Sequence, residues 1–133
     1  MIGLDTNVIV RYIVQDDIRQ SALATTLIES LSPEQPGYIS IITLIELVWV
    51  LQGAYQAPRE DIIITLDSLL KTKEIVISQA DIVAQALRLF SHTKADFSDC
   101  LIERLGHAAL CEYTVSFDKD AIKHTGMKLL GTQ

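Results

Sequence analysis

The chain opens with Met1-Ile2-Gly3-Leu4-Asp5-Thr6-Asn7-Val8, a short apolar run that stops at an acid followed by two small polar residues. Such a run predicts a buried strand, and Asp-Thr-Asn after it predicts a turn into a helix. Asp5 is therefore expected at the carboxyl end of a central strand. Ligands bind at that edge of open α/β sheets, so Asp5 is the first candidate site residue.

Length and composition indicate a globular protein. A chain of 133 residues can bury a core of its own, and we predict a single domain over residues 1–133. The hydrophobic content of 49% excludes a disordered tail, and no apolar run approaches the roughly 20 residues that span a membrane. Asp5 and Asn7 interrupt the first apolar stretch, so no secretory leader is expected. We therefore expect a soluble, cytoplasmic protein without a membrane partner.

Charge and cysteine content restrict the chemistry further. The formal net charge of -6 repels a polyanion over most of the surface, so a nucleic-acid substrate requires a bound cation that reverses the field locally. Cys100 and Cys111 form no Cys-x-x-Cys motif and have no His at ligand spacing. We predict that both thiols are small buried side chains.

The hydrophobic pattern alternates between strands and helices. Strands are predicted near residues 1–4, 38–41, 74–77, 112–117 and 127–130, and helices over 8–14, 18–31, 43–53, 57–70, 81–92, 98–110 and 120–124. This alternation implies parallel strands joined by right-handed crossovers. The predicted fold class is α/β, a three-layer α/β/α sandwich around a central, mostly parallel sheet of four to five strands.

Four acids fall at the ends of these predicted elements. They are Asp5 at the end of the first strand, Glu46 in the first turns of the helix after the second strand, Asp99 at the start of the helix over 98–110, and Asp118 at the end of the fourth strand. In a parallel sheet these positions share one edge, so the four carboxylates are expected to converge. Carboxylates about 4 Å apart repel by roughly 1 kcal/mol in water and about 4 kcal/mol at an effective dielectric of 20. The cluster therefore calls for a bound cation.

Oxygen ligands without Cys or His favour Mg²⁺ or Mn²⁺ over zinc. Such an ion lowers the pKa of a bound water and binds phosphate oxygens. The acids therefore predict metal-assisted phosphodiester hydrolysis. The alternative for each acid taken singly is a helix cap, because Asp is common at helix starts.

Three further side chains are candidates for supporting roles. Ser116 either supplies a hydroxyl to a metal-bound water or satisfies a strand end, and Asn7 either bonds a site carboxylate or caps the first helix. Asp96 lies three residues before Asp99 and is either a cap, the favoured interpretation, or a second ligand. Basic residues that either hold RNA phosphates or only face solvent are Arg11, Lys94 and Lys119.

Four motifs together resemble the PIN domain, and most of all the VapC toxins of prokaryotic type II toxin–antitoxin systems. The motifs are Leu4-Asp5-Thr6-Asn7-Val8-Ile9-Val10-Arg11-Tyr12 with Gln15-Asp16-Asp17, then Thr43-Leu44-Ile45-Glu46-Leu47, then Ala95-Asp96-Phe97-Ser98-Asp99-Cys100-Leu101-Ile102, then Ser116-Phe117-Asp118-Lys119-Asp120. They run in family order along the whole chain.

The resemblance implies an endoribonuclease that needs Mg²⁺ or Mn²⁺, cleaves structured RNA such as transfer RNA, and is inhibited by a VapB antitoxin. It also implies a homodimer, with apolar faces for partners on the helices between Val8 and Trp49. The family's acids fall on Asp5, Glu46, Asp99 and Asp118, its last hydroxyl on Ser116, where many relatives have Thr, and the polar residue after its first acid on Asn7. Asp96 is an extra acid found in part of the family.

In the mechanism that we expect, Asp5, Asp99 and Asp118 hold one or two metal ions, and Glu46 orients or deprotonates the attacking water. Two alternatives remain. One is a signalling module of the response-regulator receiver type, which needs adjacent acids after its first strand, whereas here that strand ends in a single acid. The other is a PIN fold that serves only as a binding partner.

Overall fold

The computed structural model describes residues 1–131, and the chain divides into two compact units. The first unit covers Met1–Ala80, and the second begins at Asp81. Residues 132 and 133, which the predicted single domain includes, lie outside the described residues. No helix within residues 1–131 is both long enough and apolar enough to cross a membrane.

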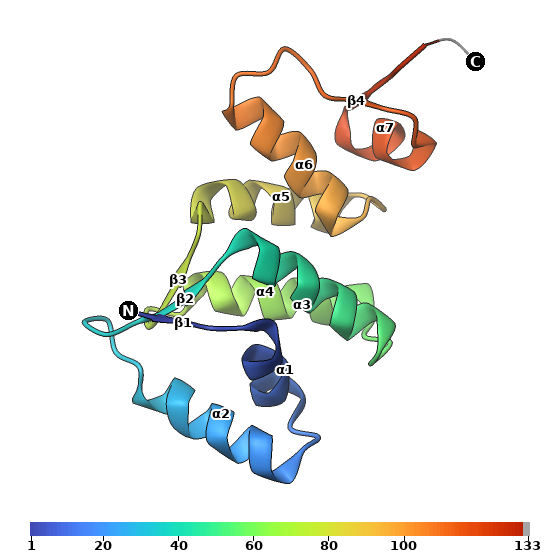
Figure 1. Cartoon of the computed structure of the whole chain (residues 1–133). Coiled ribbons are helices and arrows are strands. Elements are labelled where there is room, and N and C mark those ends of the chain that lie inside the picture. The colour runs from blue at the N-terminus through green and yellow to red at the C-terminus, as the bar shows by residue number, and fades with distance from the viewer. Residues whose placement is uncertain (132–133) are drawn as a thin grey trace. The chain divides into compact units, whose positions relative to one another are not determined.

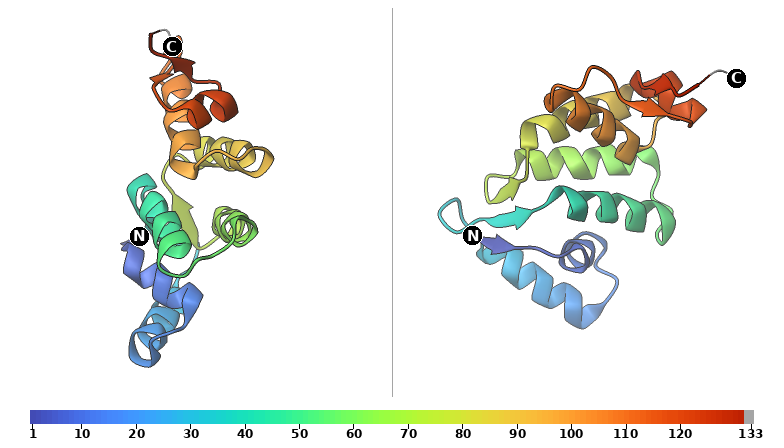
Figure 2. Two further views of the ribbon diagram at one scale, coloured as in Figure 1. Left: turned by 90° about the vertical axis from the view of Figure 1, so that its right-hand side faces the viewer. Right: turned by 45° about the horizontal axis from the view of Figure 1, so that its top comes forward.

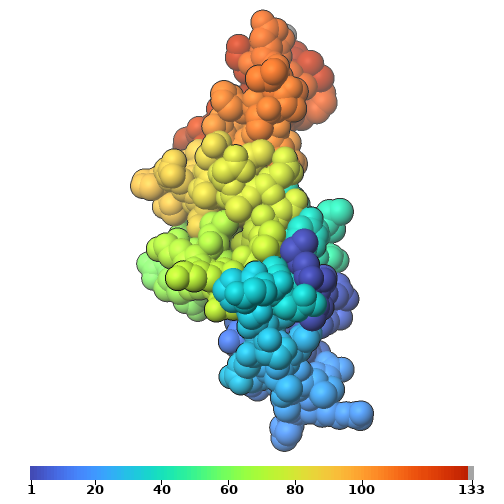
Figure 3. Space-filling model, turned by 90° about the vertical axis from the view of Figure 1, so that its left-hand side faces the viewer, coloured from blue at the N-terminus to red at the C-terminus, as the bar shows by residue number. Residues whose placement is uncertain are grey.

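A parallel sheet forms the centre of the first unit (Figure 1). The elements in chain order are β1 (Ile2–Gly3), α1 (Thr6–Val14), α2 (Ile18–Ser30), β2 (Gly37–Ile39), α3 (Ile41–Gly53), α4 (Arg59–Lys71) and β3 (Ile75–Ile77). The strand order is β1-β2-β3, and Tyr38 pairs with Gly3 on one side and with Val76 on the other. The space-filling view shows the N-terminal residues in dark blue beside the cyan segment that contains β2 (Figure 3).

Helices cover this sheet from two sides. The left view of Figure 2 shows α3 and α4 on opposite sides of the strands, and α4 contacts β3. Helix α1 packs against both α2 and α3. Leu44 and Leu47 of α3 are fully buried, and Ile62 of α4 exposes only 1% of its surface. The unit therefore has the predicted α/β/α layering.

Polar residues with extended backbone set the starts of these helices. Asp5 caps α1 and accepts a hydrogen bond from the Thr6 N–H at 2.8 Å, and Asp17 caps α2. Ser40 caps α3 and accepts from the Thr43 N–H at 3.2 Å. Because the cap stands at Ser40, the second strand ends earlier than the predicted 38–41 and Ile41 already belongs to α3.

The second unit, as far as residue 131, contains three helices and a small sheet. Its elements are α5 (Ala80–His92), which starts at the boundary, α6 (Phe97–Ala108), β4 (Val115–Ser116), α7 (Lys119–Thr125) and β5 (Lys128–Leu129). The two strands run parallel, and α7 packs against α6 and against both strands. The rings of Phe90 and Phe97 meet edge to face with centroids 5.7 Å apart, which ties α5 to the start of α6.

The α/β class and the parallel pairing are confirmed, but three details differ from the prediction. Within residues 1–131 the strands form one sheet of three and one of two, so the central sheet is smaller than the predicted four to five strands. Strand β4 covers only Val115 and Ser116 of the predicted 112–117, because its ladder partner β5 has two residues. Cys100 is buried as predicted, whereas Cys111 is exposed, since it follows the last turn of α6 in the connection to β4.

Candidate active site

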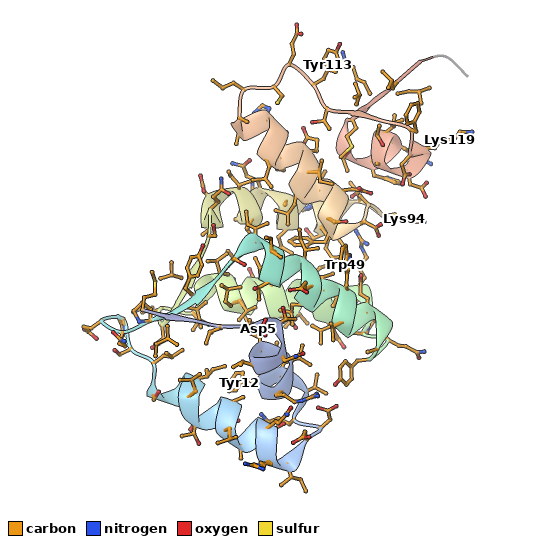
Figure 4. All side chains as sticks on the ribbon, viewed as in Figure 1. Asp5, Tyr12, Trp49, Lys94, Tyr113 and Lys119 are labelled. Carbon is orange, nitrogen blue, oxygen red and sulfur yellow. The ribbon has the colours of Figure 1, made fainter. Side chains whose placement is uncertain are left out.

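Two candidate acids of the first unit bind the same residue, Thr6. The Thr6 hydroxyl donates a hydrogen bond to Oε1 of Glu46 at 3.0 Å, and the Thr6 N–H donates to Oδ1 of Asp5 at 2.8 Å. Thr6 is buried, with 6% of its surface exposed, whereas Asp5 and Glu46 are exposed. Figure 4 shows Asp5 where β1 passes into α1. The first unit therefore presents two carboxylates at one place.

The position of Glu46 follows from the packing of α3. Glu46 lies in the second turn of that helix, and its neighbours Leu44 and Leu47 are fully buried. Since α1 packs against α3, the first residue of α1 comes within reach of the Glu46 carboxylate. Both acids thus lie where the helices after β1 and β2 begin, as predicted.

The second unit brings three acids into electrostatic contact. Asp99 lies in the first turn of α6 and is partly buried. Burial is the main cause that raises the pKa of Asp99, and the negative charges of Asp96 and Asp118 raise it further. Asp118 is close enough to affect Asp99, although it comes from a different element. Asp99 and Asp118 therefore interact electrostatically within this unit.

Asp118 is fixed at the start of α7. Its Oδ1 accepts hydrogen bonds from the N–H groups of Asp120 at 2.9 Å and Ala121 at 3.3 Å. The Ser116 hydroxyl accepts from the Asp118 N–H at 3.0 Å. Of the two interpretations of Ser116, the structure thus realises the one in which the hydroxyl satisfies the end of its strand.

The structure bears on the alternatives that the sequence leaves open for Asp96 and Asn7. Asp96 occupies the N-cap position of α6, the favoured interpretation, but its carboxylate makes no capping hydrogen bond, and its negative charge raises the pKa of Asp99. Asn7 does not cap α1, because Asp5 occupies that position and Asn7 is already inside the helix. Asn7 is exposed and lines a cavity of about 450 Å³ between α1 and α2.

Arg11 belongs to a network that joins α1, the start of α2 and the segment after α3. Its Nη1 lies 3.1 Å from Oδ1 of Asp16 and donates to the Tyr55 hydroxyl at 3.2 Å, while that hydroxyl donates to Oδ2 of Asp16 at 2.7 Å. Nε of Arg11 donates to Gln20 at 2.8 Å. These bonds use much of the guanidinium, so Arg11 has a structural role. Lys94 and Lys119 are exposed (Figure 4).

The sequence alone did not reveal the role of Thr6. Thr6 was expected only to shape a turn, yet it contacts a carboxylate 40 residues further along the chain. A signal was available, since a buried Thr beside an acid at a helix start must direct its hydroxyl to some partner. The identity of that partner depends on the packing of α1 on α3, which a single sequence does not reveal.

The donor chemistry of these residues fits a hard cation. The candidate ligands are all carboxylates, and the acids around Asp99 repel one another, which a bound cation would relieve. No group of three or more His, Cys, Asp or Glu side chains within residues 1–131 is arranged to hold a metal. Mg²⁺ usually takes one or two carboxylates and completes its shell with waters and substrate phosphates. The convergence of all four acids stays a prediction.

The sequence matches the model of a known protein family. The model of the PIN domain family matches residues 2–127, a range that includes Asp5, Glu46, Asp99 and Asp118. No curated protein matches the chain.

Proposed function

Because the chain belongs to the PIN-domain family, whose members are generally metal-dependent nucleases, we propose that it is an endoribonuclease that depends on Mg²⁺ or Mn²⁺. The observation that carries this proposal is the match over residues 2–127, within which the four acids occupy the starts of helices or the turns before them. Membership in this family also removes the support for a receiver-type signalling module.

We propose that Asp5, Glu46, Asp99 and Asp118 are the catalytic residues of a single PIN-like domain over residues 1–133. Asp5 and Glu46 come from the first unit, and Asp99 and Asp118 from the second. The raised pKa of Asp99 supports a functional role for this acid, since burial and like charges at one place are typical of functional acids. The positive ends of the helix dipoles of α1 and α6 favour the ionised carboxylates beside them.

Each acid has a proposed role. Asp5, Asp99 and Asp118 would hold the cation, directly or through water. When bound, the ion supplies a water of lowered pKa and charge stabilisation at the scissile phosphate. Glu46, held by Thr6 at 3.0 Å, orients the attacking water or accepts its proton. Water attacks the phosphorus and the P–O3' bond breaks, so the 3'-oxygen leaves as a hydroxyl and the phosphate stays on the 5'-oxygen of the other fragment.

Within the family we propose a VapC-like toxin that acts on structured RNA such as transfer RNA in the cytoplasm and is neutralised by a VapB-like antitoxin. The cavity between α1 and α2 supports an antitoxin segment, because Val8, Leu23 and Leu27 give it an apolar lining. Ile42 and Trp49 of α3 expose 71% and 62% of their surfaces, which supports an apolar contact with a partner such as the second subunit of a homodimer.

The experiment that tests this function is an analysis of RNA products. Purified wild type and Asp5→Asn protein are incubated with transfer RNA and Mg²⁺, with and without EDTA, and the termini of any fragments are determined. We expect the wild type to cleave the RNA and Asp5→Asn not to cleave it. Cleavage by the wild type should require free Mg²⁺ and should leave fragments with 5'-phosphates. A 2',3'-cyclic phosphate would refute the mechanism, because it would identify the ribose hydroxyl as the nucleophile. Equal cleavage by both proteins would indicate contamination and leave a binding-only PIN fold.

A further inference from the structure

Thr6 connects the two candidate acids of the first unit and has no assigned role in the proposed reaction. It is the first residue of α1, and its side chain is buried. A Thr hydroxyl carries one hydrogen to donate, and Thr6 gives it to Oε1 of Glu46 at 3.0 Å. The backbone N–H of the same residue donates to Asp5 at 2.8 Å.

This contact restrains a side chain that would otherwise move freely. Glu46 is exposed, and a Glu side chain loses much rotamer freedom when it is fixed. A hydrogen bond to a charged acceptor is among the stronger ones, so it favours one orientation of the carboxylate. Since a carboxylate is planar, the position of Oε1 also restricts the position of the second oxygen.

The anchor itself is rigid. Thr6 is β-branched and buried in the first turn of α1, and Asp5 caps that turn. A rigid, buried donor that holds an exposed catalytic carboxylate is the arrangement that preorganises a site. We propose that Thr6 is a positioning residue that orients Glu46 toward the attacking water. This inference rests on the proposed nuclease function.

The test compares two variants at this position. Thr6→Val keeps the shape and the β-branch but removes the hydroxyl, whereas Thr6→Ser keeps the hydroxyl. We expect Thr6→Val to lower kcat for RNA cleavage about tenfold, which corresponds to about 1.4 kcal/mol, with KM nearly unchanged. Thr6→Ser should restore kcat to within about threefold of the wild type.

A matched control is available on α3. Thr43 is also buried, at 9% exposure, but its hydroxyl contacts Ser40 and no candidate acid. Thr43→Val should leave kcat unchanged, although it is free to alter stability. In a Glu46→Ala background, Thr6→Val should cause no further loss of kcat, because the group that Thr6 orients is absent.

A second measurement does not depend on activity. In metal-free protein, Thr6→Val should lower the urea midpoint of unfolding less in the Glu46→Ala background than in the wild type. Unchanged kcat in Thr6→Val, or equal losses in Thr6→Val and Thr6→Ser, would overturn the inference. If the wild type cleaves no RNA, the proposed function fails, and the coupling in unfolding alone decides whether Thr6 holds Glu46.

Discussion

The hydroxyl of Ser116 accepts a hydrogen bond from the backbone N–H of Asp118 at 3.0 Å. Oδ1 of the same Asp118 caps the start of α7 by accepting a hydrogen bond from the N–H of Asp120. Together these bonds fix the turn between β4 and α7, and with it the carboxylate of Asp118. The orientation of this acid therefore depends on a hydroxyl at position 116.

Ser116→Ala should reduce nuclease activity without unfolding the protein. The lost hydrogen bond is worth about 1 kcal/mol, so we expect a decrease in kcat of about three- to tenfold and a small decrease in Tm. Ser116→Thr keeps the acceptor and serves as the control. Steady-state cleavage kinetics measure the effect, and equal activity of the Ala and Thr variants would contradict the role of the hydroxyl.

The pKa of Asp99 predicts a pH dependence of stability in the metal-free protein. Burial, Asp96 and Asp118 raise this pKa above the ordinary value of 3.8, so the folded state binds the proton more tightly than the unfolded state. The stability that this proton contributes is present below pH 3.8 and is lost as the pH rises through the raised pKa. Asp99→Asn should therefore increase the stability more at pH 7 than at pH 3.5.

NMR titration of the carboxyl carbons provides the direct measurement. We expect the pKa of Asp99 to fall in Asp96→Asn, because one of the two like charges is removed. Asp67→Asn, in α4 of the first unit, is a control that should leave it unchanged. An Asp99 carboxyl that titrates at or below its ordinary pKa would contradict the electrostatic contact.

The Asp16 carboxylate should show the opposite pH dependence. The hydrogen bond from Tyr55 and the charge of Arg11 lower the pKa of Asp16 below 3.8. The resulting stability is present above pH 3.8 and is lost as the pH falls through the lowered pKa. Tyr55→Phe should therefore decrease the urea midpoint at pH 7, and the difference from the wild type should shrink below pH 3.8. A difference that is constant with pH would refute this account.

Gly37 in β2 should not tolerate a larger residue. A Cβ at this position would lie 2.8 Å from Cδ1 of Leu4 and 2.9 Å from Cδ1 of Leu31, so Gly37→Ala forces both side chains to move. We expect a loss of about 1–3 kcal/mol in the free energy of unfolding. Gly3→Ala is the control, because a Cβ there meets nothing within 4 Å. Equal stability of the two variants would contradict the packing around β2.

The sequence alone predicted the order of elements and the places of the acids well. Asp5 ends the first strand and Asp118 follows the fourth, because short apolar runs and the polar residues that stop them are local signals. The resemblance to the PIN domain, carried by four motifs, is confirmed by the match over residues 2–127.

Features that depend on packing between distant segments were not predictable in this way. The bond from Thr6 to Glu46 requires α1 to lie against α3. The carboxylate of Asp96 leaves its cap position unbonded, although the residue type favours a cap. The extent of β4 depends on its partner β5, since a strand forms only where a second strand supplies the hydrogen bonds.

The most direct test of a single catalytic centre is the rate of Mg²⁺-dependent RNA cleavage in Asp5→Asn, Asp99→Asn and the double variant. Asp5 and Asp99 come from different units. If both acids serve the same reaction, substitution of either one should remove RNA cleavage. We predict that each single variant lowers kcat by at least about 100-fold and that the double variant is little worse than either, because residues that act as one group are not additive. Wild-type activity in either single variant, or cleavage that persists in EDTA, would contradict the account.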